Sequence, residues 1–249
     1  MLIGTERRGR VLVITMQREA KRNAINHEMA LGIDAALNEL DDDPELWAGV
    51  ITGTSTVFCA GTALEAGPRA VTERGGEYGI IRRRRTTPLV AAVEGWALGG
   101  GFELALACDL IVAARTARFG LPEVQRGLVA SSGALFRAPR ALPLHVAKQM
   151  LLTGQPLDPE RAYALGVVNV VTEPGEALAE AVRLATEISA NGPVAVQASL
   201  AAVNRIVGAG DDDGWDATDE AVEKVLASSD LTEGVGAFFE KRAPRWSNR

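Results

Sequence analysis

Residues 88–109, PLVAAVEGWALGGGFELALACD, decide the fold of this chain. A short apolar run bounded by proline and glycine predicts a buried strand at 88–94, and the apolar run after the glycine triplet 99–101 predicts a helix. Glycines between a strand and a helix let the backbone approach a ligand closely. They also precede unpaired amide groups that can hold a carbonyl oxygen as it gains negative charge. The other interpretation of this stretch, a glycine-lined crossing of two packed elements, stays open.

Outward from this stretch, the pattern indicates a mixed α/β core followed by helices. Short β-branched runs predict further strands at residues 11–15, 50–52, 110–112 and 167–171. Apolar residues recur at helical spacing from Met29 to Leu40, and Pro44 ends this predicted helix. After residue 174 only helical patterns remain. We therefore expect an α/β core over residues 1–174 and a helical region over residues 175–249.

Composition limits the classes of protein. The 249 residues are 47% hydrophobic and 23% charged, which is typical of a globular protein and excludes wholesale disorder. The net charge of −6 argues against binding of nucleic acid or anionic lipid through bulk charge. With only 2 cysteines there is no disulfide framework, so we expect a cytoplasmic protein. The most apolar stretch contains Glu94, Glu103 and Asp109, and the start lacks a secretory signal, so no membrane association is expected.

Several kinds of active site are excluded by what the sequence lacks. The 2 histidines, His27 and His145, do not form a zinc-binding pattern, and no paired cysteines occur, so no metal site is expected. The sequence also lacks the Gly-x-Ser-x-Gly motif of serine hydrolases and the phosphate-binding loop of nucleotide-binding proteins. The groups left for catalysis are carboxylates and backbone amides.

Two glutamates flank the glycine-rich stretch. Glu103 lies in the first turn after the triplet, where a charge inside an apolar run is costly unless it is used or paired. Glu123 follows a second turn at 120–122. Two carboxylates in one partly dry pocket push their pKa values apart, which gives one acid and one base. Taken singly, a glutamate is more commonly a cap or a solvent-facing side chain, and it is the pair beside the glycines that favours a catalytic role. Residues 58–63 form another small-residue turn, which is either a source of a second amide or an ordinary turn.

These motifs, with others in the same order along nearly the whole chain, resemble the enoyl-CoA hydratase/isomerase (crotonase) superfamily. The resemblance is carried by KRNAIN at 21–26, FCAG at 58–61, ALGGGFELA at 97–105, FGLPE at 119–123 and LTG at 152–154. It implies a crotonase-like spiral of ββα units, with a C-terminal helical region that forms homotrimers or dimers of trimers. It also implies an enzyme of lipid metabolism that acts on an acyl-CoA thioester. No cofactor is implied, because CoA is part of the substrate.

The resemblance also implies roles for individual residues. The amides of Thr62 and Gly100 would form an oxyanion hole for the thioester carbonyl. Glu103 would orient and deprotonate the attacking water, and Glu123 would exchange the proton at the α-carbon. The substrate-binding residues implied are Lys21 and Arg22, near the CoA phosphates, with Ala24, Ala60, Thr62, Ala63, Leu64 and Gly100. The expected activity is that of an enoyl-CoA hydratase, a hydro-lyase that reversibly adds water in syn fashion to a 2-enoyl-CoA.

Two departures from the family pattern keep alternatives open. Ala63 stands where the family often has aspartate, and residues 130–134, ASSGA, resemble a carnitinyl-CoA dehydratase-like branch. The alternatives are therefore carnitinyl-CoA dehydration, enoyl-CoA isomerisation, which in this family commonly keeps only the second glutamate, and a non-catalytic relative that binds acyl-CoA or RNA. The arginines at 82–85 are expected on a solvated helix face rather than at CoA phosphates, and residues 211–214 in a solvated turn.

Overall fold

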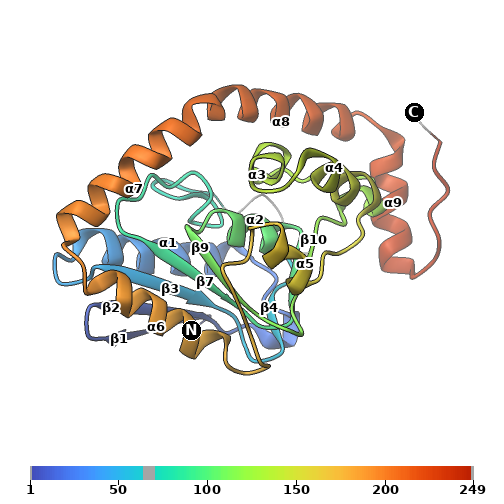
Figure 1. The fold of residues 1–249 in the computed structure, drawn as a ribbon. Coiled ribbons are helices and arrows are strands. Elements are labelled where there is room, and N and C mark those ends of the chain that lie inside the picture. The colour runs from blue at the N-terminus through green and yellow to red at the C-terminus, as the bar shows by residue number, and fades with distance from the viewer. Residues whose placement is uncertain (1, 64–70, 248–249) are drawn as a thin grey trace.

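The computed structural model describes residues 2–63 and 71–247, and its main layer is a six-stranded sheet (Figure 1). In spatial order its strands are β1 (Ile3–Arg8), β2 (Val11–Met16), β3 (Ala48–Thr52), β7 (Leu89–Val93), β9 (Leu110–Ala114) and β11 (Val170–Thr172). Only β1 and β2 are antiparallel; all other neighbours are parallel. The strands predicted at 11–15, 50–52, 88–94 and 110–112 are confirmed, and the one predicted at 167–171 is shifted, because β11 begins only at Val170. β1 was not predicted, because most of its side chains are polar and exposed.

A smaller sheet lies beside the main one and consists of three parallel strands. Its strands are β4 (Val57–Cys59), β8 (Trp96–Leu98) and β10 (Arg118–Gly120), with β8 in the middle. Along the chain, β3, β7 and β9 of the main sheet are each followed by one strand of the small sheet. The chain thus winds between two sheets in successive turns, which is the predicted spiral. A short hairpin of β5 (Val71–Thr72) and β6 (Gly76–Glu77) lies between β4 and β7 in sequence.

The remaining regular elements of the described chain are helices and 3₁₀ turns. They are α1 (His27–Asp42), α2 (Gly100–Leu106), α3 (Ala134–Ala141), α4 (Leu144–Thr153), α5 (Pro159–Ala164), α6 (Ala177–Ser189), α7 (Pro193–Val207), α8 (Asp211–Leu226) and α9 (Ser229–Glu240), with 3₁₀ turns η1 (Glu19–Lys21), η2 (Glu123–Arg126) and η3 (Gly208–Gly210). The helix predicted from Met29 to Leu40 is confirmed as α1. Its first turn is capped by Asn26, whose Oδ1 accepts a hydrogen bond from the Met29 amide.

The two faces of the main sheet are covered by different helices. One face packs into the large core that includes α1 and α2, and the other packs against α6 through Ala177, Ala181 and Ala185. In Figure 1, α7 and α8 form an arch along one side of the molecule, and α9 follows at its end. The division at residues 174 and 175 stays a prediction. α6, on the C-terminal side of that division, belongs to the layer that covers the sheet.

Two predictions about charged runs are wrong. The arginines at 82–85 lie in turns and coil, and two of their side chains are buried: that of Arg83 pairs with Asp34 at 2.7 Å, and that of Arg85 pairs with Asp109 at 2.7 Å. Burial is tolerated because each guanidinium meets a carboxylate. The acidic residues 211–213 form the first turn of α8 rather than a loop, where negative charge is favourable beside the positive end of the helix dipole.

Among the residues that the structure describes, no helix is both long enough and apolar enough to span a bilayer.

Candidate active site

The three strands of the small sheet bring the predicted turns to one edge. Because β4, β8 and β10 are parallel, their carboxyl ends lie side by side, and each is followed by one of the turns expected to form the site. The turn after β4 contains Thr62, the turn after β8 contains Gly100, and the turn after β10 leads to Glu123. The Gly99 amide donates a hydrogen bond to the Gly120 carbonyl at 2.8 Å and ties two of these turns together. Residues that are distant in sequence are therefore neighbours in space.

The first two turns pack tightly against each other at Gly61. A Cβ atom placed on Gly61 would lie 2.9 Å from the Leu98 carbonyl oxygen and 3.1 Å from the Gly100 nitrogen, so a side chain there would press on the second turn. Gly61 also has a φ of +91°, which is in the left-handed region that glycine tolerates best. Gly61 is thus required both by its conformation and by its neighbour.

Two backbone amides belong to these turns at Thr62 and Gly100. The Gly61 carbonyl accepts a hydrogen bond from the Ile25 amide. In a trans peptide the next N–H, that of Thr62, points the opposite way from this carbonyl and so away from Ile25. Gly100 is the first residue of α2, so its N–H has no partner within the helix. Thr62 and Gly100 line one cavity, and theirs are the two amides predicted for the oxyanion hole.

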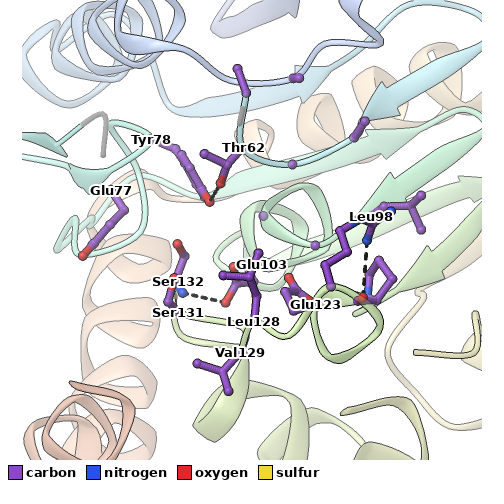
Figure 2. Close-up of a pocket in the computed structure, with 18 of the residues that line it drawn as sticks. Thr62, Glu77, Tyr78, Leu98, Glu103, Glu123, Leu128, Val129, Ser131 and Ser132 are labelled. Atoms are coloured by element: carbon purple, nitrogen blue, oxygen red, sulfur yellow. Dashed lines mark hydrogen bonds between the residues drawn. The ribbon is translucent and has the colours of Figure 1, made fainter. Parts of the chain in front are cut away.

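Glu103 is held in α2 with its carboxylate at the start of α3. Its side chain is 2% exposed. Its Oε1 accepts a hydrogen bond from the Ser132 amide at 2.7 Å (Figure 2) and another from the Ala134 amide at 3.0 Å, and together they fix the carboxylate in place. A buried carboxylate is stable only when such donors compensate for lost water.

Glu123 stands opposite, at the first residue of η2, in a different electrostatic setting. Its Oε2 is buried and has no hydrogen-bond partner among the described residues, and its Oε1 lies against Gly99, where a Cβ would be only 2.9 Å away. Burial, and secondly the charge of Glu103, raises the pKa of Glu123 to about 8. At neutral pH the site therefore presents a protonated Glu123 in the same cavity as Glu103, which is an arrangement suited to one acid and one base.

One cavity of about 680 Å³ contains these groups. Its lining includes every predicted site residue that the structure describes: Lys21, Arg22, Ala24, Ala60, Thr62, Ala63, Gly100, Glu103 and Glu123. The remaining one, Leu64, lies outside the described residues. The lining also includes Ser131 and Ser132, from the stretch 130–134 that departs from the family pattern, and side chains that sequence reasoning missed, among them Arg18, Glu77, Tyr78 and Arg126. Arg18 could have been found from the sequence, because it shortly precedes the KRNAIN motif. No sequence pattern marks Tyr78 or Arg126 as a site residue.

Comparison with known proteins identifies the family. The profile of the enoyl-CoA hydratase/isomerase family matches residues 6–249. Enoyl-CoA hydratase EchA19 of Mycobacterium tuberculosis is 38% identical over 98% of this chain and 96% of its own length. The mevalonyl-coenzyme A hydratase sidH of Aspergillus fumigatus is 37% identical over 95% of this chain and 91% of its own. The crystal structure of a carnitinyl-CoA hydratase from Mycobacterium avium superposes with a TM-score of 0.93 at 41% identity, covering 100% of this chain and 99% of that one.

The parallel small sheet with three site turns at one edge, and the matches over nearly the full length, define an enzyme of the crotonase fold. The chain belongs to the enoyl-CoA hydratase/isomerase family. The family resemblance, the fold class and the expectation of an enzyme are thereby confirmed.

Proposed function

We propose that this protein catalyses the reversible hydration of a 2-enoyl-CoA thioester. The observation that carries the proposal is the meeting of Glu103 and Glu123 in one cavity beside the Thr62 and Gly100 amides. Isomerisation only moves a proton between carbons and needs no base for water. The second carboxylate in the cavity therefore supports hydration over isomerisation.

In the proposed reaction Glu103 takes a proton from water while the water oxygen adds to C3 of the enoyl group. The π electrons move toward the thioester, whose oxygen becomes an enolate oxygen held by the two amides. Glu123, protonated before the reaction, donates its proton to C2 and completes the C–H bond. In the proposed reaction both carboxyls act from one face of the double bond, so the water and the proton add in syn fashion. The cycle closes when Glu103 loses its proton and Glu123 regains one from solvent.

The CoA end is proposed at the basic part of the cavity lining. Lys21 and Arg22, with Arg18 and Arg126, supply the cationic side chains of that lining. Guanidinium and ammonium groups bind phosphate through charge-assisted hydrogen bonds. This supports the assignment of Lys21 and Arg22 to the CoA phosphates, and of Ala24, Ala60 and Ala63 to the adjoining part of CoA.

A substrate panel tests the proposal. We expect the purified protein to consume the ultraviolet absorbance of the conjugated enoyl thioester and to form a 3-hydroxyacyl-CoA. Graded straight-chain enoyl-CoAs should be compared with crotonobetainyl-CoA and the dehydrated form of mevalonyl-CoA. The last two substrates have polar acyl groups. They are included because the polar side chains of Ser131 and Ser132 line the cavity and because two of the relatives are named for substrates of this kind. Turnover of no enoyl-CoA, or a product with only a shifted double bond, would contradict hydration.

The pH dependence follows from the raised pKa of Glu123. The carboxyl is protonated below about pH 8 and ionised above it. As the proton donor in hydration it must be protonated, so kcat/KM for hydration should fall as pH rises through about 8. Hydration takes up no net proton, so its equilibrium constant does not change with pH, and kcat/KM for dehydration should fall in parallel. The form active in dehydration, with Glu103 protonated and Glu123 ionised, holds the same number of protons as the form active in hydration. Measurement of both directions across that range checks the assignment. A kcat/KM for hydration that stays constant or rises through about pH 8 would contradict it.

Three further features belong to the proposal. We propose that hydration needs no metal or redox cofactor, so dialysis against a chelator should leave the activity unchanged.

We propose a homotrimer, or a dimer of trimers, supported by apolar side chains that α7 and α8 expose: Val194, Val203, Ile206, Val207 and Leu226. Light scattering tests this, and a strict monomer would contradict it. A cytoplasmic location is proposed on the two free cysteines, Cys59 and Cys108.

A further inference from the structure

The hydroxyl of Tyr78 lies beside Thr62 and Gly100, the two residues whose amides form the proposed oxyanion hole. Its oxygen is 2.7 Å from Thr62 Oγ1, and Figure 2 shows the two side chains meeting tip to tip at the cavity. A Cβ placed on Gly100 would be 2.4 Å from the same oxygen, so the hydroxyl rests directly on the Gly100 backbone. Tyr78 is 6% exposed and lines the cavity. Its hydroxyl is therefore a buried polar group at the point where a thioester oxygen is expected.

The backbone at Tyr78 adopts a strained conformation that holds the side chain in place. Tyr78 has a φ of +58°, a conformation that is strained for a bulky residue and is found most often at functional sites. The next residue, Gly79, packs so closely on α1 that a Cβ there would lie 2.4 Å from the Ala30 carbonyl oxygen. The preceding hairpin is anchored to the same helix, because Thr72 Oγ1 donates a hydrogen bond to Asp34 Oδ1 at 2.7 Å. These contacts fix Tyr78 from both sides.

The hydroxyl keeps its proton under working conditions. Burial, and secondly the charge of Glu103, raises the pKa of Tyr78 above its ordinary value. A phenol has one hydrogen to donate and can also accept. The side chains of Thr62 and Ser132 both hydrogen-bond the phenol, and when their hydroxyls donate to its oxygen the phenol hydrogen is left for an acceptor in the cavity.

We propose that the Tyr78 hydroxyl is a third hydrogen-bond donor to the thioester oxygen, beside the Thr62 and Gly100 amides. The Thr62 side chain then positions Tyr78, while the Thr62 backbone acts on the substrate. This inference rests on the proposed function, because it assumes an acyl-CoA thioester bound at these amides. It makes Tyr78 a catalytic residue that no motif in the sequence indicates.

The Tyr78→Phe variant tests the inference, because it removes the hydroxyl and keeps the ring that packs on Gly100. We expect kcat for hydration to fall by about 10²-fold, the lower end of the loss seen when one oxyanion donor is removed. The matched control is Tyr163→Phe, since Tyr163 is the other tyrosine of the chain and is exposed. The control should keep wild-type kcat.

A spectroscopic readout separates hydrogen bonding from packing. A 3-aryl enoyl-CoA, whose conjugation disfavours hydration, absorbs at longer wavelength when donors polarise its carbonyl. The bound probe should show a smaller red shift in Tyr78→Phe than in the wild type. A wild-type kcat in Tyr78→Phe, or a reduced kcat with an undiminished red shift, would overturn the inference.

Should Tyr78→Phe fail to fold, Thr62→Val takes its place. It keeps the backbone amide and removes the hydroxyl that positions Tyr78. A red shift between those of the free and wild-type-bound probe supports the inference, and the full wild-type shift overturns it. Failure of the proposed function is a separate result, since it would appear as a wild-type protein that hydrates none of the enoyl-CoAs.

Discussion

The Glu123→Gln variant should lower kcat for hydration by about 10²–10⁴-fold, the loss typical when a general acid or base is removed. The side-chain amide of glutamine has nearly the same shape as the protonated carboxyl of Glu123, but it cannot give a proton to C2 of the substrate. Because Glu123 Oε2 has no partner among the described residues, its replacement breaks no side-chain hydrogen bond of that atom, and the fold should persist. We therefore expect the loss in kcat rather than in KM, measured by the decay of the enoyl-thioester absorbance.

The control for this variant is Glu28→Gln, which makes the same change at an exposed position in the first turn of α1. It should retain wild-type kcat and KM. The role given to Glu123 would be wrong if Glu123→Gln kept more than about a tenth of the wild-type kcat. Loss of a general acid leaves a far smaller residual activity than that.

The Glu103→Gln variant is expected to lose a similar factor of about 10²–10⁴ in kcat, for a different reason. The carbonyl oxygen of glutamine can still accept the hydrogen bonds that the Ser132 and Ala134 amides now donate to Glu103, so the start of α3 should stay in place. What is lost is the base that activates water. Removing the charge of Glu103 should also lower the pKa of Glu123, because that charge is one cause of its raised value.

Deuterium exchange distinguishes the two glutamates. A saturated acyl-CoA has no double bond to hydrate, so exchange of its α-proton with deuterated water reports on the group that acts at C2 alone. Glu103→Gln should retain this exchange, and Glu123→Gln should lose it. The reverse pattern would show that the two roles are interchanged, and equal loss in both variants would show that neither carboxylate acts independently.

The fold and the centre of the site could be predicted because their signals are local in sequence. The glycine triplet and the turn after residue 57 stand out by composition, and the apolar runs identify the strands of the main sheet. The strands β4, β8 and β10 could not be recognised in this way, since each has only three residues. Their parallel pairing is nevertheless what places Thr62, Gly100 and Glu123 at one edge.

The missed features depend on contacts between distant parts of the chain. Tyr78 has no pattern of its own, and its importance comes from a hydroxyl that meets Thr62 and Gly100 in space. The arginine run resembled a solvated surface because its partners, such as Asp34 and Asp109, are distant in sequence. Charge composition alone does not reveal such pairing, and for this reason the prediction failed.

The central claim is that one thioester oxygen meets two backbone amides while two carboxyls face the same side of the adjacent double bond. A crystal structure of the protein with a bound 3-hydroxyacyl-CoA tests this claim most directly. We expect the thioester oxygen about 2.7–3.1 Å from both the Thr62 and the Gly100 nitrogen. The 3-hydroxyl group should contact Glu103, and C2 should face Glu123. A thioester oxygen bound away from these amides, or carboxyls on opposite faces of the C2–C3 bond, would contradict the account.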